Sequence, residues 1–191
     1  YYHKNWGFCL THNQLKKMDQ SKDYKVVIKS SHTKGFLNYG EALLTGTSSK
    51  EFLISTYCCH PSMANDNLSG MVLWVLILKW LRSYDHKHSY RFVIAPETIG
   101  AITYLWKNEE KMKRVNGGYV LTTAGGPDGF TYSQSFLGTN EIDRAARLAF
   151  ADSNIEYTNY KFDVTGSDER QYCSPAFRIP IGSITRSKYF E

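Results

Sequence analysis

The stretch that decides the fold is residues 51–81, EFLISTYCCHPSMANDNLSGMVLWVLILKWL. Its first part, residues 51–58, is a continuous apolar run, which is typical of a strand buried on both faces of a sheet. Its last part opens a long, largely apolar helix over residues 67–84, expected to begin at or next to Asp66. Residues 58–70, which join the strand to the helix, contain a histidine, a proline, two asparagines and an aspartate. Buried polar groups are costly unless satisfied, so these side chains either cap and turn the chain or hold a ligand.

The same alternation of strand and helix continues along the chain. Buried strands are predicted over 90–96, 117–126 and 179–185, and helices over 98–113 and 140–153. Strands that alternate with helices predict an α/β fold. We therefore expect a three-layer sandwich with a mostly parallel, mixed sheet and helices on both faces.

The N-terminal part of the chain has a different pattern. Residues 24–30 and 35–46 resemble alternating strands and predict a small β layer near the N-terminus. A chain of 191 residues fits a single domain over 1–191, with 20–48 as part of an inserted or accessory β region. The chain opens without an initiator methionine, so we expect it to be a fragment of a longer chain.

Composition excludes several classes of protein. The longest apolar run, residues 71–81, contains Lys79 and is far shorter than the roughly 20 residues of a membrane span. The formal charge of +5 is mild and forms no concentrated basic stripe, so no nucleic-acid partner is expected through this domain. The four cysteines lack zinc-ribbon spacing and are expected to be reduced thiols of a cytoplasmic protein.

Two loops at the carboxyl ends of strands carry the candidate site, because ligands bind at this edge of a parallel sheet. The first loop contains His60 and Asp66, an imidazole and a carboxylate that together suit zinc. The alternative is structural: Asp66 caps the following helix, helped by Asn65 or Asn67, and His60 is only a hydrogen-bonded neighbour.

The second loop places Glu97 directly after Pro96, at the end of the next strand. One helix and one strand separate Asp66 from Glu97, which puts both at the same edge of the sheet. A carboxylate there is placed to take a proton from metal-bound water, as a general base. The alternative is an acid favoured by the dipole of the helix that follows.

A third group of candidates lies near the C-terminus, in TGSDERQYCSP at residues 165–175. Asp168 and Arg170 are candidate substrate-binding residues, because an arginine can grip a carboxylate or phosphate with two hydrogen bonds. The alternative is a solvated turn with an internal ion pair. Arg186, at the end of the last strand, is a second candidate for binding an anion.

The motifs resemble those of the co-catalytic zinc aminopeptidase family, which includes bacterial leucine aminopeptidases, glutaminyl cyclases and glutamate carboxypeptidase. The resemblance rests on ANDNLSG opening a helix and on a strand that ends in PETIG. It is closer to a bacterial aminopeptidase-like subfamily associated with polysaccharide or flagellin-modification gene sets, through blocks of the type YCCHPSMANDNLSG, APETIG and GSDERQYCSP. It implies metal ligation by His60 and by Asp66, the latter at the position of a bridging aspartate.

The chain departs from the family pattern at two ligand positions. Thr98 follows Glu97 where the family has a second glutamate, and Thr122 and Thr123 stand where another ligand aspartate is usual. One zinc ion is therefore expected rather than two. The family's last ligand is a histidine after the final strand, so the third protein ligand is expected beyond Glu191.

The function implied by the resemblance is zinc-dependent hydrolysis of an amide bond in a small peptide or another amide-bearing substrate. Two alternatives stay open at this point. One is an amidohydrolase acting on an amino sugar or glycan precursor. The other is a catalytically silent binding module, which the substitutions at Thr98, Thr122 and Thr123 favour.

Overall fold

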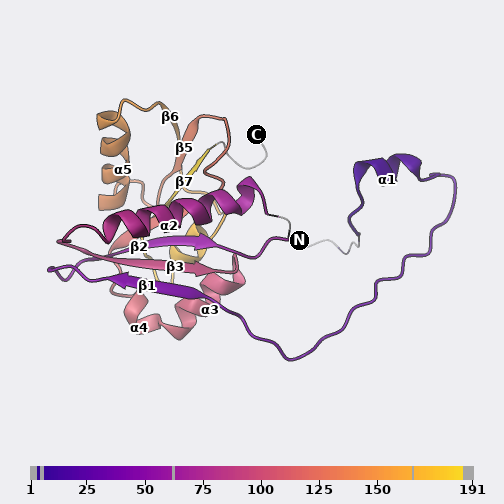
Figure 1. Cartoon of the computed structure of the whole chain (residues 1–191), viewed down its shortest axis with the longest axis horizontal. Coiled ribbons are helices and arrows are strands. Elements are labelled where there is room, and N and C mark those ends of the chain that lie inside the picture. The colour runs from indigo at the N-terminus through magenta and orange to yellow at the C-terminus, as the bar shows by residue number, and fades with distance from the viewer. Residues whose placement is uncertain (1–3, 5–6, 62, 165, 187–191) are drawn as a thin grey trace. The chain divides into compact units, whose positions relative to one another are not determined.

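The computed structural model of the chain describes residue 4 and residues 7–61, 63–164 and 166–186. Its centre is a seven-stranded mixed sheet in the order β1-β3-β2-β4-β7-β5-β6 (Figure 1). The pairs β2–β3, β2–β4, β4–β7 and β5–β6 are parallel, and β1–β3 and β5–β7 are antiparallel. The strands are β1 (Gly40–Leu44), β2 (Glu51–Tyr57), β3 (Ser89–Ala95), β4 (Gly117–Leu121), β5 (Phe130–Ser133), β6 (Tyr157–Tyr160) and β7 (Ile181–Arg186).

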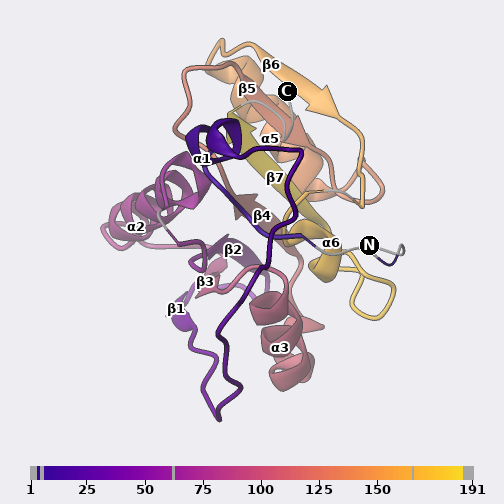
Figure 2. The same ribbon diagram turned by 90° about the vertical axis from the view of Figure 1, so that its right-hand side faces the viewer.

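Helices cover both faces of this sheet. Helix α2 lies on one face, and α3 and α6 lie on the opposite face (Figure 2). The helices are α1 (His12–Lys17), α2 (Gly70–Leu81), α3 (Ile99–Lys107), α4 (Glu109–Met112), α5 (Glu141–Asp152) and α6 (Glu169–Tyr172), with an irregular turn η1 (Asn65–Ser69) before α2. The predicted three-layer α/β fold with a mostly parallel sheet is confirmed.

The alternation of side chains along β3 shows why the central strands are largely apolar. Val93 and Ala95 join the core beneath α3, α4 and α6, whereas Phe92 and Ile94 pack on the other face with Trp74 of α2. Successive residues of a strand point to opposite faces, so a strand covered on both sides needs apolar residues at nearly every position.

Helix α2 differs from its predicted form in two respects. It begins at Gly70 rather than next to Asp66, because residues 65–69 form the irregular turn η1. Trp74 is buried at 8% exposure, but Leu78 and Leu81 are only half-buried at the rim of the same core. An apolar helix under a sheet would suit burial at all three positions, but only Trp74 is largely buried. Within the described residues, no helix is both long and apolar enough to cross a membrane.

The prediction of a small β layer near the N-terminus is wrong. Residues 24–39 are all described and form no strand, and β1 is instead an edge strand of the main sheet, antiparallel to β3. Its side chains alternate between half-buried and exposed, as expected of a strand at the edge of a sheet. An alternating pattern predicts a strand without specifying which strand it pairs with.

The chain divides into two units, residues 1–35 and 36–191. The first unit contains α1, whose N-cap Thr11 forms a capping box with Gln14. The Thr11 side chain accepts from the backbone N–H of Gln14, and the Gln14 side chain accepts from that of Thr11. Such reciprocal bonds satisfy two amide groups that a helix start otherwise leaves unpaired.

Candidate active site

The two candidate loops meet because β2 and β3 are parallel neighbours. Tyr57 at the end of β2 is paired with Ala95 at the end of β3, and the Cys58 amide donates to the Ala95 carbonyl at 3.0 Å. The chain therefore leaves both strands side by side, and His60 and Glu97 follow within three residues. The two candidate loops therefore lie together at the carboxyl ends of these strands, as predicted, and the functional role of this edge stays a prediction.

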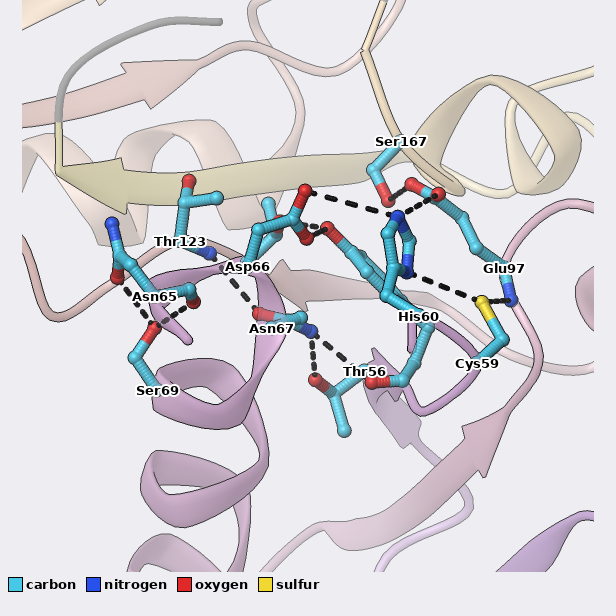
Figure 3. Close-up of polar contacts among 12 residues, drawn as sticks. Thr56, Cys59, His60, Asn65, Asp66, Asn67, Ser69, Glu97, Thr123 and Ser167 are labelled. Carbon is cyan, nitrogen blue, oxygen red and sulfur yellow. Dashed lines mark hydrogen bonds and ion pairs between the residues drawn. The ribbon is translucent and has the colours of Figure 1, made fainter. Parts of the chain in front are cut away.

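His60 lies between the two candidate carboxylates (Figure 3). Its Nε2 atom is 3.8 Å from Oδ2 of Asp66 and 3.7 Å from Oε2 of Glu97. The three side chains are 35%, 41% and 22% exposed, in the order His60, Asp66 and Glu97. A small ligand can therefore reach all of them from solvent.

A hydrogen bond from Tyr57 orients the Asp66 carboxylate. The Tyr57 hydroxyl donates to Oδ1 of Asp66 at 2.6 Å and lies 2.7 Å from Oγ1 of Thr122. This contact leaves Oδ2 facing His60. Neither η1 nor α2 has a side-chain cap hydrogen bond from the described residues. Asp66 is therefore part of the polar cluster and is not a helix cap.

The asparagines on either side of Asp66 have structural roles. Asn67 is fully buried; its amide donates to Thr56 and its Oδ1 accepts from the Thr123 amide, which ties the ends of β2 and β4 to η1. Asn65 accepts hydrogen bonds from Ser69 and from the backbone of the loop after β4. Gly70 is required beside Asn67, because a Cβ there would lie 2.3 Å from the Asn67 side-chain oxygen.

Cys59 contacts both His60 and Glu97. Its Sγ lies 3.4 Å from Nδ1 of His60 and accepts a hydrogen bond from the Glu97 amide at 3.2 Å. Burial raises the pKa of the Cys59 thiol, and the charge of the Glu97 carboxylate raises it further. In the His60 tautomer with the proton on Nδ1, this ring nitrogen faces the sulfur and Nε2 presents a lone pair toward the carboxylates.

Residues just before α6 form hydrogen bonds with Glu97 and with Thr98, the residue after it. The Ser167 hydroxyl donates to Oε1 of Glu97 at 2.7 Å, and Oδ1 of Asp168 accepts from the Thr98 amide at 2.7 Å. Oε1 of Glu169 accepts from the Ser167 amide at 3.1 Å. Asp168 and Glu169 are buried at 1% and 5% exposure. Burial raises the pKa of each to about 7, and the neighbouring carboxylates, including Glu97, add to the shift.

These raised pKa values predict that stability falls as the pH rises from about 4 to 7. In that window folded Asp168 and Glu169 bind more protons than they do in the unfolded chain, so the free energy of unfolding decreases with pH. The loss is about 1.4 kcal/mol for each unit by which a pKa is raised. Urea denaturation at several pH values should show a shallower fall for Asp168→Asn. An unchanged slope would contradict the prediction, and the exposed Asp152→Asn is the control.

The three predicted substrate-binding residues lie against other partners. Asp168 is buried against Thr98, and Nη1 of Arg170 donates to the Val164 carbonyl at 3.0 Å. Nη1 of Arg186 donates to the carbonyl of Asp128 at 2.8 Å, and its guanidinium lies over the Phe130 ring. Substrate binding by Asp168, Arg170 and Arg186 stays a prediction.

Tyr57, Cys59 and Ser167 were not among the site residues predicted from the sequence. Cys59 and Ser167 adjoin flagged residues, so their positions were available from the sequence, but their contacts were not. Tyr57 ends a strand in which every residue is compatible with burial. Its role depends on the direction of its hydroxyl, which sequence periodicity does not specify.

Two side chains of the site, His60 and Asp66, have donor atoms that fit one zinc ion. Tetrahedral zinc with ligand bonds near 2.0–2.2 Å places its ligand atoms about 3.4 Å apart. The 3.8 Å between His60 Nε2 and Asp66 Oδ2 is close to that spacing, and both atoms are accessible. The described part of the chain contains no group of three or more His, Cys, Asp and Glu side chains that could enclose one ion.

Comparison with known proteins agrees with this fold. The model of a family described as "Domain of unknown function (DUF4910)" matches residues 8–191. The chain belongs to the DUF4910 family. A Clostridium acetobutylicum protein is 45% identical to this chain over 189 residues. Its name assigns it to polysaccharide biosynthesis and gives it an aminopeptidase-like domain. The match covers 99% of this chain and 43% of that protein.

Solved structures place this DUF4910 domain among the aminopeptidase-like folds. A crystal structure from Clostridium acetobutylicum, named by inference as a peptidase, matches with a TM-score of 0.86 and 44% identity over 100% of this chain and 45% of its own. An aminopeptidase from Aneurinibacillus sp. strain AM-1 matches with a TM-score of 0.65 and 15% identity, over 78% and 39% of the two chains.

A third similar structure is an Acidobacteriales bacterium glutaminyl cyclase, with a TM-score of 0.63 and 13% identity, over 78% of this chain and 58% of that one. At such identities the likeness shows the fold alone. The chain spans less than half the length of both Clostridium acetobutylicum proteins.

Proposed function

We propose that this DUF4910 domain is a zinc-dependent hydrolase of amide bonds. The observation that carries the proposal is the convergence of an imidazole and two carboxylates at the carboxyl edge of β2 and β3, with His60 Nε2 within 4 Å of Asp66 and Glu97. The aminopeptidase-like fold and the name of the Clostridium acetobutylicum relative support the same reaction class.

Each residue has a distinct task in this mechanism. His60 and Asp66 hold the ion, with Cys59 and Tyr57 fixing the orientation of their side chains. Zinc held at such a site polarises a carbonyl group and lowers the pKa of water. Oε2 of Glu97 would take a proton from the water whose oxygen forms a bond to the amide carbon, and would give it to the amine nitrogen as the C–N bond breaks. Oε1 stays bound to Ser167 throughout.

The substrate is a small peptide or another molecule with an amide bond. Within this class, the name of the Clostridium acetobutylicum relative favours an amino sugar or glycan precursor as the molecule whose amide bond is cleaved. This substrate also suits the resemblance to a subfamily associated with polysaccharide or flagellin modification. We place the reaction in the cytoplasm, where the four free cysteines would stay reduced.

A second candidate, a catalytically silent binding module, has two observations in its favour. Thr98 follows Glu97 without a second carboxylate, and the described residues supply two metal ligands rather than three.

Because the described residues supply two ligands, we propose one zinc ion per chain, with the remaining ligand outside the described residues.

The two candidates are separated by measuring turnover with zinc on a panel of aminoacyl amides, dipeptides and N-acetylated amino sugars, using mass spectrometry to detect cleavage. Release of an amine that stops when zinc is chelated and resumes when it is restored would support the hydrolase. Binding of panel members without cleavage by the zinc-loaded chain would support the silent module.

His60→Ala should lower zinc affinity by about 10-fold or more, because it removes one of two protein ligands in the described part of the site. Zinc titration by calorimetry measures the effect, and His12→Ala, a change at an exposed histidine in α1, is the control. Equal zinc affinity in wild type and His60→Ala would show that the ion does not bind at His60.

A further inference from the structure

The segment before α6 reaches the Glu97 turn from 70 residues further along the chain. Ser167 and Asp168 are each 1% exposed, yet both direct a polar side-chain atom at this turn. Ser167 binds the Glu97 carboxylate, and Asp168 binds the amide of the next residue, Thr98, each at 2.7 Å. Two consecutive buried polar side chains therefore contact two consecutive residues of the candidate site.

The backbone at Thr98 shows what the second contact holds. Thr98 has φ 61° and ψ −71°, a conformation that residues with a β-branched side chain rarely adopt. Such conformations persist only where surrounding contacts fix them, and they gather at functional sites. Oδ1 of Asp168 accepts from the amide of this residue, so it fixes the bend by which the chain leaves Glu97 and enters α3.

The first contact selects which carboxylate oxygen of Glu97 faces the site. Oε1 accepts from the Ser167 hydroxyl, and the other oxygen, Oε2, lies 3.7 Å from His60 Nε2 (Figure 3). A glutamate side chain has three rotatable bonds, so a side chain that is 22% exposed can turn away from the site unless one oxygen is anchored.

We infer that Ser167 and Asp168 are positioning residues for Glu97: Ser167 anchors its carboxylate with Oε2 toward His60, and Asp168 fixes the Thr98 backbone that follows it. This role differs from direct substrate binding by Asp168. What Glu97 does once positioned rests on the proposed function, whereas the two anchoring contacts do not.

A double-mutant cycle in urea denaturation tests the anchor without any substrate. Ser167→Ala, Glu97→Ala and the double variant should be non-additive, with the unfolding equilibrium constant of the double variant differing roughly 10-fold from the product of the single effects. Ser83→Ala replaces a serine at the C-terminal end of α2 and should combine additively with Glu97→Ala. Additive effects of Ser167→Ala and Glu97→Ala would overturn the inference.

The Thr98 contact is tested by a second cycle. Thr98→Gly removes the cost of a positive φ, so Asp168→Ala, which removes the acceptor oxygen, should destabilise the Thr98→Gly background less than it destabilises wild type. Equal destabilisation in both backgrounds would overturn the role of Asp168.

Turnover then distinguishes positioning from simple packing. Ser167→Ala should lower kcat by about 10- to 100-fold with KM and zinc affinity unchanged, and Ser167→Thr, which keeps the hydroxyl, should recover most of the loss. An unchanged kcat in Ser167→Ala would overturn the inference even if the cycles are non-additive. If wild type hydrolyses nothing, the proposed function fails, and the two cycles alone decide whether Ser167 and Asp168 hold Glu97.

Discussion

Glu97→Gln should lower turnover by about 10²–10⁴-fold, which is the usual contribution of a positioned acid–base group. Glutamine keeps the size of the side chain and can still accept from Ser167, but it cannot take up the proton. Zinc affinity should change little, because Glu97 is not a metal ligand in the proposed mechanism. Steady-state kinetics on a cleaved amide, together with zinc titration of the same samples, measures both quantities.

The control is Glu110→Gln, a change at an exposed glutamate of α4, which should alter neither quantity. Loss of zinc from Glu97→Gln would show that the glutamate is a ligand and that the one-ion site with a separate base is wrong. Full turnover in Glu97→Gln would rule out Glu97 as the general base.

Trp74→Ala should destabilise the fold by about 3–5 kcal/mol, the range for removing a buried aromatic side chain. Trp74 is 8% exposed, packs edge-on against Phe92 with ring centroids 5.4 Å apart, and donates from Nε1 to the Ile54 carbonyl at 3.1 Å. The alanine variant would leave a cavity between α2 and the sheet. Urea denaturation followed by circular dichroism measures the change.

The same helix supplies a matched control. Trp80 is 60% exposed and contacts Tyr84 at the end of α2, so Trp80→Ala should cost about 1 kcal/mol or less. Similar losses for the two tryptophans would contradict the assignment of Trp74 to the core between α2 and the sheet. Leu78→Ala should fall below the range of a fully buried leucine, because its side chain is half-buried.

The central strands and the helices between them could be predicted because burial on both faces leaves a continuous apolar run. Residues 51–58 and 90–96 have this pattern, and the structure places β2 and β3 there as parallel neighbours. Strands β5 (Phe130–Ser133) and β6 (Tyr157–Tyr160) were not predicted. They are the last two strands in the order of the sheet, and each has only four residues. Four residues are too few for a clear periodic pattern in the sequence.

The candidate site divides in the same way. His60, Asp66 and Glu97 could be identified from the sequence because each combines a chemically useful side chain with a position in a loop between a buried strand and the next helix. The sequence left open whether Asp66 caps a helix. The structure decides this through the contacts of the carboxylate: Oδ1 accepts from the Tyr57 hydroxyl and Oδ2 lies near His60, whereas neither η1 nor α2 has a side-chain cap hydrogen bond from the described residues.

The sequence by itself determined the fold class, the edge of the sheet that carries the site, and the three side chains that meet there. Only the tertiary structure decided that Asp168 is buried against Thr98 and that Ser167 binds Glu97. The physical reason is the range of the interactions. Strand burial and helix periodicity act between near neighbours in the chain, whereas the Ser167 and Asp168 contacts join residues 70 positions apart and exist only once β3, α3 and α6 have packed together.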